Sequence, residues 1–146
     1  DIYGPVSDQK YFKLIKKNIE KLSLSNKVKI YDPIFEKELK KKIYISSDFF
    51  ILPSKSENFG ISIGESLSFG VPVITTTSTP WKEIDDYKAG FLFDFSQENL
   101  TKCLKKLIGL NSEQLKTMSQ NAVKIIRDNY DFNKIIVEYI KFYKSL

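Results

Sequence analysis

Two strand-like runs, the unbroken apolar FFIL at residues 49–52 and the β-branched VPVITT at residues 71–76, constrain the fold more than any other feature. A strand without polar alternation is typical of a parallel sheet, in which both faces are covered. The segment between the runs is long enough for a helix, and Gly70 and Pro72 are residues that end helices. Strand, helix and strand in this order predict two parallel strands joined by a helical crossover.

The same alternation extends over the whole chain. Helices are expected at residues 8–24, 36–45, 60–69, 81–87, 97–108 and 112–127 and from residue 131 onward, and strands at residues 27–31, 48–52, 71–76 and 90–93. The order predicts an α/β fold, a Rossmann-like doubly wound parallel sheet with C-terminal helices, over a single domain of residues 1–146. Ile2 and Tyr3 followed by Gly-Pro resemble the end of a strand, so we expect further sequence upstream.

Composition excludes several classes of protein. With 146 residues, 42% of them hydrophobic, the chain can bury a core and is not typical of a disordered protein. No stretch approaches the roughly 20 apolar residues that a membrane-spanning helix needs. The lone Cys103 excludes a disulfide within the chain and fits a reducing, cytoplasmic compartment. The absence of histidine removes the commonest general base and metal ligand, so no metal site is expected.

The basic charge comes almost wholly from lysine. The net charge is +5, with 18 acidic residues against 23 basic ones, of which only Arg127 is an arginine. Proteins that read nucleic acid rely on arginine for bidentate contacts, so nucleic-acid binding is disfavoured. The lysines alternate with apolar residues at helical spacing, which favours a solvated surface. The alternative interpretation of these lysines is peripheral contact with an anionic membrane surface at its cytoplasmic face.

The loop 53–60 is the candidate site in this fold. Ligands of open parallel sheets bind beyond the carboxyl ends of the strands, and this loop follows such an end. Gly60 would let the backbone approach a ligand closely. The amides near Phe59, Gly60 and Ile61 begin a helix and lack intrahelical acceptors, so they favour an anion such as phosphate.

Two carboxylates flank this turn. Glu57 precedes the helix and Glu65 lies within it, with seven residues between them. Because helical side chains lean toward the N-terminus, both could accept hydrogen bonds from one polyhydroxylated ligand. Alternatively, Glu57 is a favourable charge at a helix start and Glu65 an exposed helical residue. The spacing alone leaves both interpretations open.

The longer string SDFFILPSKSENFGISIGESLSFGVPVITT, residues 47–76, resembles the signature of the family 4 retaining glycosyltransferases of the GT-B fold. Its shared elements are a strand ending in Pro-Ser, a glutamate followed closely by Phe-Gly, a second glutamate after seven residues, and a final Gly-x-Pro-Val-Ile. TSTPWKEI, residues 77–84, and Ala89-Gly90-Phe91-Leu92 also fit the family's later segments.

The resemblance implies roles for individual residues around the turn. Glu57 would be the catalytic-site glutamate that contacts hydroxyls of the donor sugar near the reacting carbon. Asn58, Phe59, Gly60 and Ile61 would meet the sugar and phosphate of the donor.

The resemblance also implies a nucleoside subsite. Glu65 would bind the ribose of the nucleotide. Gly4, Pro33 and Ile34 match the region near the nucleobase, although the glycine that the family usually has after the second strand is missing here.

The implied activity is transfer of a sugar from a nucleoside diphosphate to an acceptor hydroxyl with retention, without a metal or other cofactor, in envelope polysaccharide or glycolipid synthesis. The family's domain normally starts one strand earlier, with Gly-Arg and Lys-Gly pairs that clamp the diphosphate, and neither pair occurs here. The chain therefore resembles the C-terminal, donor-binding half of a larger enzyme. Its expected partners are the nucleotide sugar and an N-terminal acceptor-binding domain, and by itself it should be inactive.

Two alternatives differ in class from a transferase. A non-catalytic nucleotide-binding or interaction module of the same fold would not need the missing basic clamp. A dinucleotide-dependent oxidoreductase would need a G-x-G-x-x-G turn, which the sequence lacks.

Overall fold

The computed structural model describes all residues, 1–146, and confirms the α/β class with parallel strands. The elements are β1 (Ile2–Tyr3), α1 (Gln9–Lys21), β2 (Ile30–Tyr31), α2 (Lys37–Ile45), β3 (Phe50–Leu52), α3 (Ile61–Ser68), β4 (Val73–Thr76), α4 (Glu83–Asp86), β5 (Gly90–Phe93), α5 (Gln97–Ile108), α6 (Ser112–Asn129) and α7 (Phe132–Lys144). The chain divides into two compact units, Asp1–Lys41 and Lys42–Leu146. Each unit has its own parallel sheet.

The first unit contains β1, α1 and β2. The two strands are parallel, with Ile2 opposite Ile30 and Tyr3 opposite Tyr31, and the two tyrosine rings stack with centroids 4.9 Å apart. The strand predicted from residue 27 begins only at Ile30. The reason is local: the amides of Lys27 and Val28 donate to the carbonyl of Leu24 at 2.8 and 2.9 Å, so this stretch is a turn.

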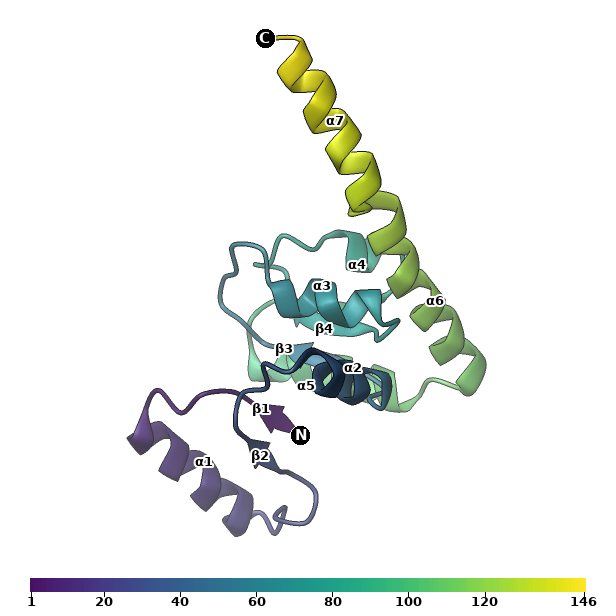
Figure 1. Cartoon of the computed structure of the whole chain (residues 1–146). Helices are drawn as coiled ribbons and strands as arrows, with labels where there is room; N and C mark the ends of the chain where they lie inside the picture. Colours follow the sequence, from purple (N-terminus) through teal and green to yellow (C-terminus); the bar gives the residue numbers. More distant parts are fainter. The chain divides into compact units, whose positions relative to one another are not determined.

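The second unit contains a parallel sheet in the order β3-β4-β5. Figure 1 labels two of its strands, β3 and β4. The central strand β4 is buried along its whole length. Because successive side chains of a strand point to opposite faces, its residues feed two cores. Val73 packs with buried residues of α3, α4 and α6, whereas Ile74 packs with Phe93 and with Cys103 of α5. Helices therefore cover both faces of this sheet.

The last helix, α7, has no buried residue. Figure 1 shows it continuing from the end of α6 away from the sheet of the second unit. Its exposed apolar residues include Phe132 at 70% and Tyr143 at 68% exposure. None of the helices combines the length and the apolar character needed to cross a membrane.

Candidate functional site

Threonine hydroxyls connect the loops at the carboxyl ends of β3, β4 and β5. Thr75 Oγ1 donates to the carbonyl of Leu52 at 2.9 Å, and Thr76 Oγ1 donates to that of Ser54 at 2.6 Å. Thr77 Oγ1, just past β4, donates to Asp94 Oδ1 at 2.8 Å. The threonine hydroxyls thus add side-chain hydrogen bonds between neighbouring strands to those of the backbone ladder. They fix the start of the loop that carries the candidate residues.

The turn that precedes α3 depends on a glycine. Gly60 is the N-cap of α3 and has φ 75° and ψ 63°, a left-handed conformation that favours glycine. No side chain caps the helix. The amides of its first turn, beginning at Ile61, therefore lack the side-chain acceptor that Ser96 supplies to α5 or Asn111 to α6. Unsatisfied amides at a helix start favour an anion.

The space beside Gly60 is filled by protein. A Cβ at this position would lie 3.0 Å from Ile63 Cδ1 and 3.5 Å from Trp81 Nε1. The sequence suggested that this glycine makes room for a ligand. The structure gives a further reason for a glycine here: the left-handed backbone and close packing against Ile63 and Trp81. The exposed residues of the turn are instead Asn58, Phe59 and Ile61.

The second glutamate of the pair has a defined neighbour. Glu65 is half-buried, and the Tyr44 hydroxyl donates a hydrogen bond to its Oε2 at 3.3 Å. The same hydroxyl lies 3.2 Å from the carbonyl oxygen of Ser62. The Glu65 carboxylate therefore lies beside the first turn of α3, on the side expected from the lean of helical side chains. Burial, and then the charge of Glu65, raise the pKa of Tyr44 above its ordinary value.

The first glutamate, Glu57, is half-buried in the loop between β3 and α3. It belongs to the second unit together with Asn58, Phe59, Gly60, Ile61 and Glu65. The structure thus places the predicted sugar, phosphate and ribose residues in one loop and the helix that follows it.

The predicted nucleobase residues lie in the first unit. Gly4 follows β1, and its amide donates to the carbonyl of Tyr31 at 3.2 Å. Pro33 and Ile34 follow β2 and are half-buried. These residues lie at the carboxyl ends of the two parallel strands β1 and β2.

Several residues near the turn were not predicted to have a role there. Trp81 and Tyr130 pack around Phe59, with ring centroids 5.0 Å from Phe59 to Trp81 and 5.7 Å from Phe59 to Tyr130. Tyr44 contacts Glu65. Trp81 stands in the string TSTPWKEI, but neither tyrosine belongs to any motif. Their separation in sequence from the turn left no local signal.

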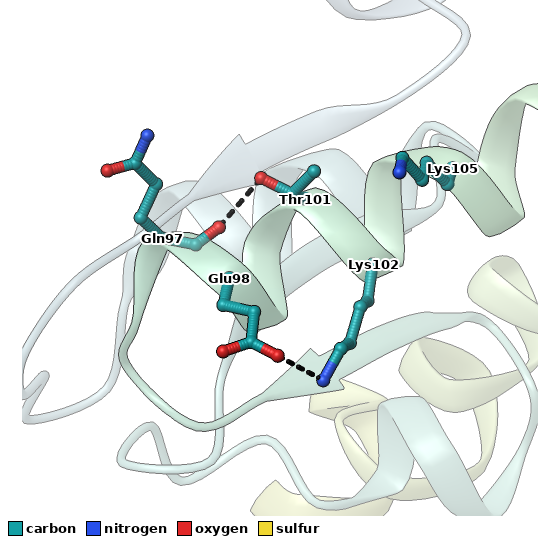
Figure 2. A pocket seen from close by; sticks show the side chains of 5 residues that line it. All are labelled: Gln97, Glu98, Thr101, Lys102 and Lys105. Carbon is teal, nitrogen blue, oxygen red and sulfur yellow. Dashed lines mark hydrogen bonds and ion pairs between the residues drawn. The ribbon is translucent and has the colours of Figure 1, made fainter.

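A hollow of about 550 Å³ lies elsewhere, along α5 (Figure 2). All of its lining side chains come from this one helix: Gln97, Glu98, Thr101, Lys102 and Lys105. Thr101 Oγ1 donates to the carbonyl of Gln97 at 2.8 Å, and Lys102 pairs with Glu98 at 2.7 Å. All five residues lie on an exposed face of a single helix, so the hollow does not compete with the turn as a site. Nowhere do three cysteine, aspartate or glutamate side chains gather as metal ligands.

Comparison with known proteins finds relatives that are similar to this chain in sequence. A glycogen synthase of Desulfitobacterium hafniense is 25% identical over 120 residues, which cover 77% of this chain and 26% of the relative. The Escherichia coli protein "O-antigen biosynthesis glycosyltransferase WclY" is 28% identical over 99 residues, which cover 68% of this chain and 27% of the relative. The chain therefore spans about a quarter of the length of these relatives.

Solved structures agree on the fold. Anabaena Alr3699/HepE, crystallised with UDP and glucose, matches with a TM-score of 0.82 and 22% identity, over 99% of this chain and 40% of that one. WaaG, described as a glycosyltransferase of lipopolysaccharide biosynthesis, matches with a TM-score of 0.70 over 88% of this chain and 33% of that one. The family model "Glycosyl transferases group 1" matches residues 1–125. The chain belongs to this family of glycosyltransferases, and its fold is the Rossmann-like fold of the GT-B enzymes.

Proposed function

We propose that this chain is the donor-binding half of a retaining glycosyltransferase that moves a sugar from a nucleoside diphosphate to an acceptor hydroxyl. The observation that carries the proposal is the uncapped start of α3, which follows the Glu57–Gly60 turn and has the Glu65 carboxylate beside its first turn. Backbone amides, a helix N-terminus and a carboxylate are the groups needed to bind phosphate and ribose together.

The proposed chemistry is electrostatic. The barrier to transfer is departure of the nucleoside diphosphate, on which negative charge grows as the glycosidic bond breaks. The amides at Gly60 and Ile61 would donate to that charge without having to reorient, which is how preorganised donors lower a barrier. Glu57 would hold the sugar hydroxyls near the reacting carbon, and Glu65 would accept from the ribose. Tyr44, by donating to Glu65 Oε2, limits the orientations that this carboxylate can adopt.

The chain would share this function with a larger protein. HepE was crystallised with UDP-glucose and with UDP, which supports a nucleotide sugar as the donor class here. Because the chain spans only part of its relatives, we propose that an N-terminal acceptor-binding half completes the enzyme. The named relatives in O-antigen and lipopolysaccharide synthesis support an envelope glycan or glycolipid as the acceptor.

Binding of UDP by the chain tests the proposal. We expect Glu65→Gln to weaken UDP binding about ten-fold or more, because a hydrogen bond to a charged group contributes roughly 1.5–3 kcal/mol. Glu98→Gln is the matched control, since this glutamate lies on α5 with 77% exposure. NMR titration measures both dissociation constants and tolerates weak binding.

Comparing two ligands separates the roles of the glutamates. Glu57→Gln should leave UDP binding unchanged and weaken UDP-glucose binding, because Glu57 is proposed to contact only the sugar. Equal titrations of wild type and Glu65→Gln would contradict the ribose role. Failure of the wild type to bind either ligand would instead favour an interaction module of the same fold.

A further inference from the structure

Three aromatic side chains from separate parts of the second unit meet at the turn. Phe59 lies in the turn, Trp81 lies in the loop after β4, and Tyr130 joins α6 to α7. The Trp81 and Tyr130 centroids are 4.9 Å apart, and Tyr130 meets Phe59 edge-on. Phe59 is 44% exposed, whereas Trp81 is 1% exposed. Phe59 therefore packs on two rings, Trp81 and Tyr130, that belong to other parts of the second unit.

Trp81 contacts the turn through both its polar and its apolar atoms. Its Nε1–H donates to the carbonyl of Phe59, so its one hydrogen-bonding group is used on the backbone of the turn. The six-membered ring lies against the first turns of α3: a Cβ at Gly64 would be 3.3 Å from Trp81 Cη2. Gly60 packs against the same indole. Phe59, Gly60 and Gly64, three of the seven residues between the two glutamates, thus contact a single side chain.

Tyr130 is held in turn by Glu83 of α4. Its hydroxyl donates to Glu83 Oε1 at 3.3 Å. The other oxygen, Glu83 Oε2, is buried and has no hydrogen-bond partner. Burying a carboxylate costs free energy unless it is hydrogen-bonded, so loss of the Tyr130 hydrogen bond would be destabilising. The consequence is a chain of contacts from Glu83 through Tyr130 to Phe59.

We propose that Trp81 and Tyr130 are positioning residues, which hold the Glu57–Gly60 turn and the first amides of α3 in the geometry that binds the donor. The inference rests on the proposed function for the identity of the ligand, a nucleoside diphosphate. It adds two residues that lie outside the string of residues 47–76. They act through the carbonyl and the ring of Phe59.

The first test needs no ligand. The amides of Ile63 and Gly64 donate to the carbonyl of Gly60 at 2.8 and 3.4 Å, so their hydrogen exchange reports on the order of this turn. We expect Trp81→Phe, which keeps a ring and removes the donor, to speed exchange at these two amides about five- to ten-fold, as for loss of one net hydrogen bond. Exchange in β4 should not change.

Two further variants keep the test falsifiable. Tyr130→Phe removes a single oxygen and should have the same effect in a smaller measure, even if Trp81→Phe fails to fold. Tyr87→Phe is the matched control: it removes a tyrosine hydroxyl that accepts from Asn129 Nδ2 at 3.4 Å and lies outside the contacts to Phe59. The dissociation constant for UDP should rise several-fold in the first two variants and stay at the wild-type value in the control.

The outcomes distinguish a positioning role from a contribution to general stability. Faster exchange confined to the start of α3, together with weaker UDP binding, supports positioning. Exchange that is unchanged, or faster by the same factor in β4 as in α3, overturns it, because Trp81 and Tyr130 would then contribute only to general stability. A wild-type chain that binds no UDP contradicts the proposed function, and the exchange measurement still decides whether the two aromatic residues hold the turn.

Discussion

At the scale of single residues, Gly90 shows how closely two strands can approach. A Cβ at this position would come within 1.8 Å of the carbonyl oxygen of Val73, on the neighbouring strand β4. Neither backbone can move away without loss of the ladder that pairs β4 with β5. We therefore expect Gly90→Ala to lower the free energy of unfolding by about 3 kcal/mol or more, at the upper end for overpacking.

Gly109 provides the control for this prediction. It follows α5, and a Cβ there would meet nothing closer than 3.4 Å. Gly109→Ala should change the free energy of unfolding by less than about 1 kcal/mol. Urea denaturation of both variants measures the difference, and similar midpoints would show that β5 can shift to admit a methyl group.

Tyr44 predicts a dependence of stability on alkaline pH. Burial, and then Glu65, raise its pKa above the ordinary value of 10.0. The folded state therefore keeps the phenol proton at pH values where the unfolded state has lost it. The contribution is complete below pH 10 and is lost as the pH rises from there through the folded pKa.

The variant Tyr44→Phe isolates this contribution. Other groups also titrate at high pH, so the useful quantity is the fall in unfolding free energy between pH about 8 and about 11, compared between variant and wild type. We expect a smaller fall in Tyr44→Phe. An equal fall would mean that Tyr44 ionises as easily in the folded chain as in the unfolded one.

At the scale of elements, α6 and α7 differ in what they bury although both are amphipathic. Ile125 of α6 is fully buried in the core that α6 shares with α3 and α4, whereas Ile136 of α7 is 42% exposed. Ile125→Ala should cost about 2–5 kcal/mol, the usual range for a buried isoleucine. Ile136→Ala, the matched change, should cost less than about 1 kcal/mol. Comparable losses, measured by thermal unfolding, would show that α7 packs on a surface in solution.

The elements themselves were largely predictable from the sequence. Helical periodicity, and caps such as Asp8 before α1 and Ser96 before α5, are local signals, and local hydrogen bonds decide where these helices begin. The strand that ends at Tyr31 was predicted too long, because the amides of Lys27 and Val28 form a turn by donating to the carbonyl of Leu24.

The candidate site was predictable only in part. The string around Glu57 and Glu65 carries a family resemblance, and it placed both residues in the correct loop and helix. Their neighbours could not be found in this way. Tyr44 lies 21 residues before Glu65, and Tyr130 reaches Glu83 across 47 residues. Such contacts depend on how helices pack on the sheet, which no periodicity encodes.

At the scale of the whole molecule, Cys103 can report unfolding of the second unit. It is 7% exposed, and its partners in the core are Ile74 and Phe93 on the sheet. Burial raises the pKa of the thiol, and the nearby Lys106 lowers it by less. Because the thiol is buried and only the thiolate reacts with disulfide reagents, modification requires this core to open.

We expect the thiol of the folded chain to react at least about 100-fold more slowly than that of the chain in concentrated urea. Spectrophotometric assay with an aromatic disulfide measures both rates. Equal rates would show that α5 separates from the sheet without global unfolding. A rate in the folded chain that falls as UDP is added would also measure how strongly the ligand stabilises this unit.

Binding of an anion at the start of α3 would also affect the order of its first turn. Asp8, Ser96, Asn111 and Asp131 give four other helices a first acceptor from within the chain, but Gly60 gives α3 none. An anion bound at Ile61 would act as the missing cap, so it would complete the helix as well as occupy a site. By linkage, whatever strengthens the first turn also tightens binding, and a bound anion stabilises the turn by the same free energy. A bound substrate would then also stabilise the folded form of the helix that binds it.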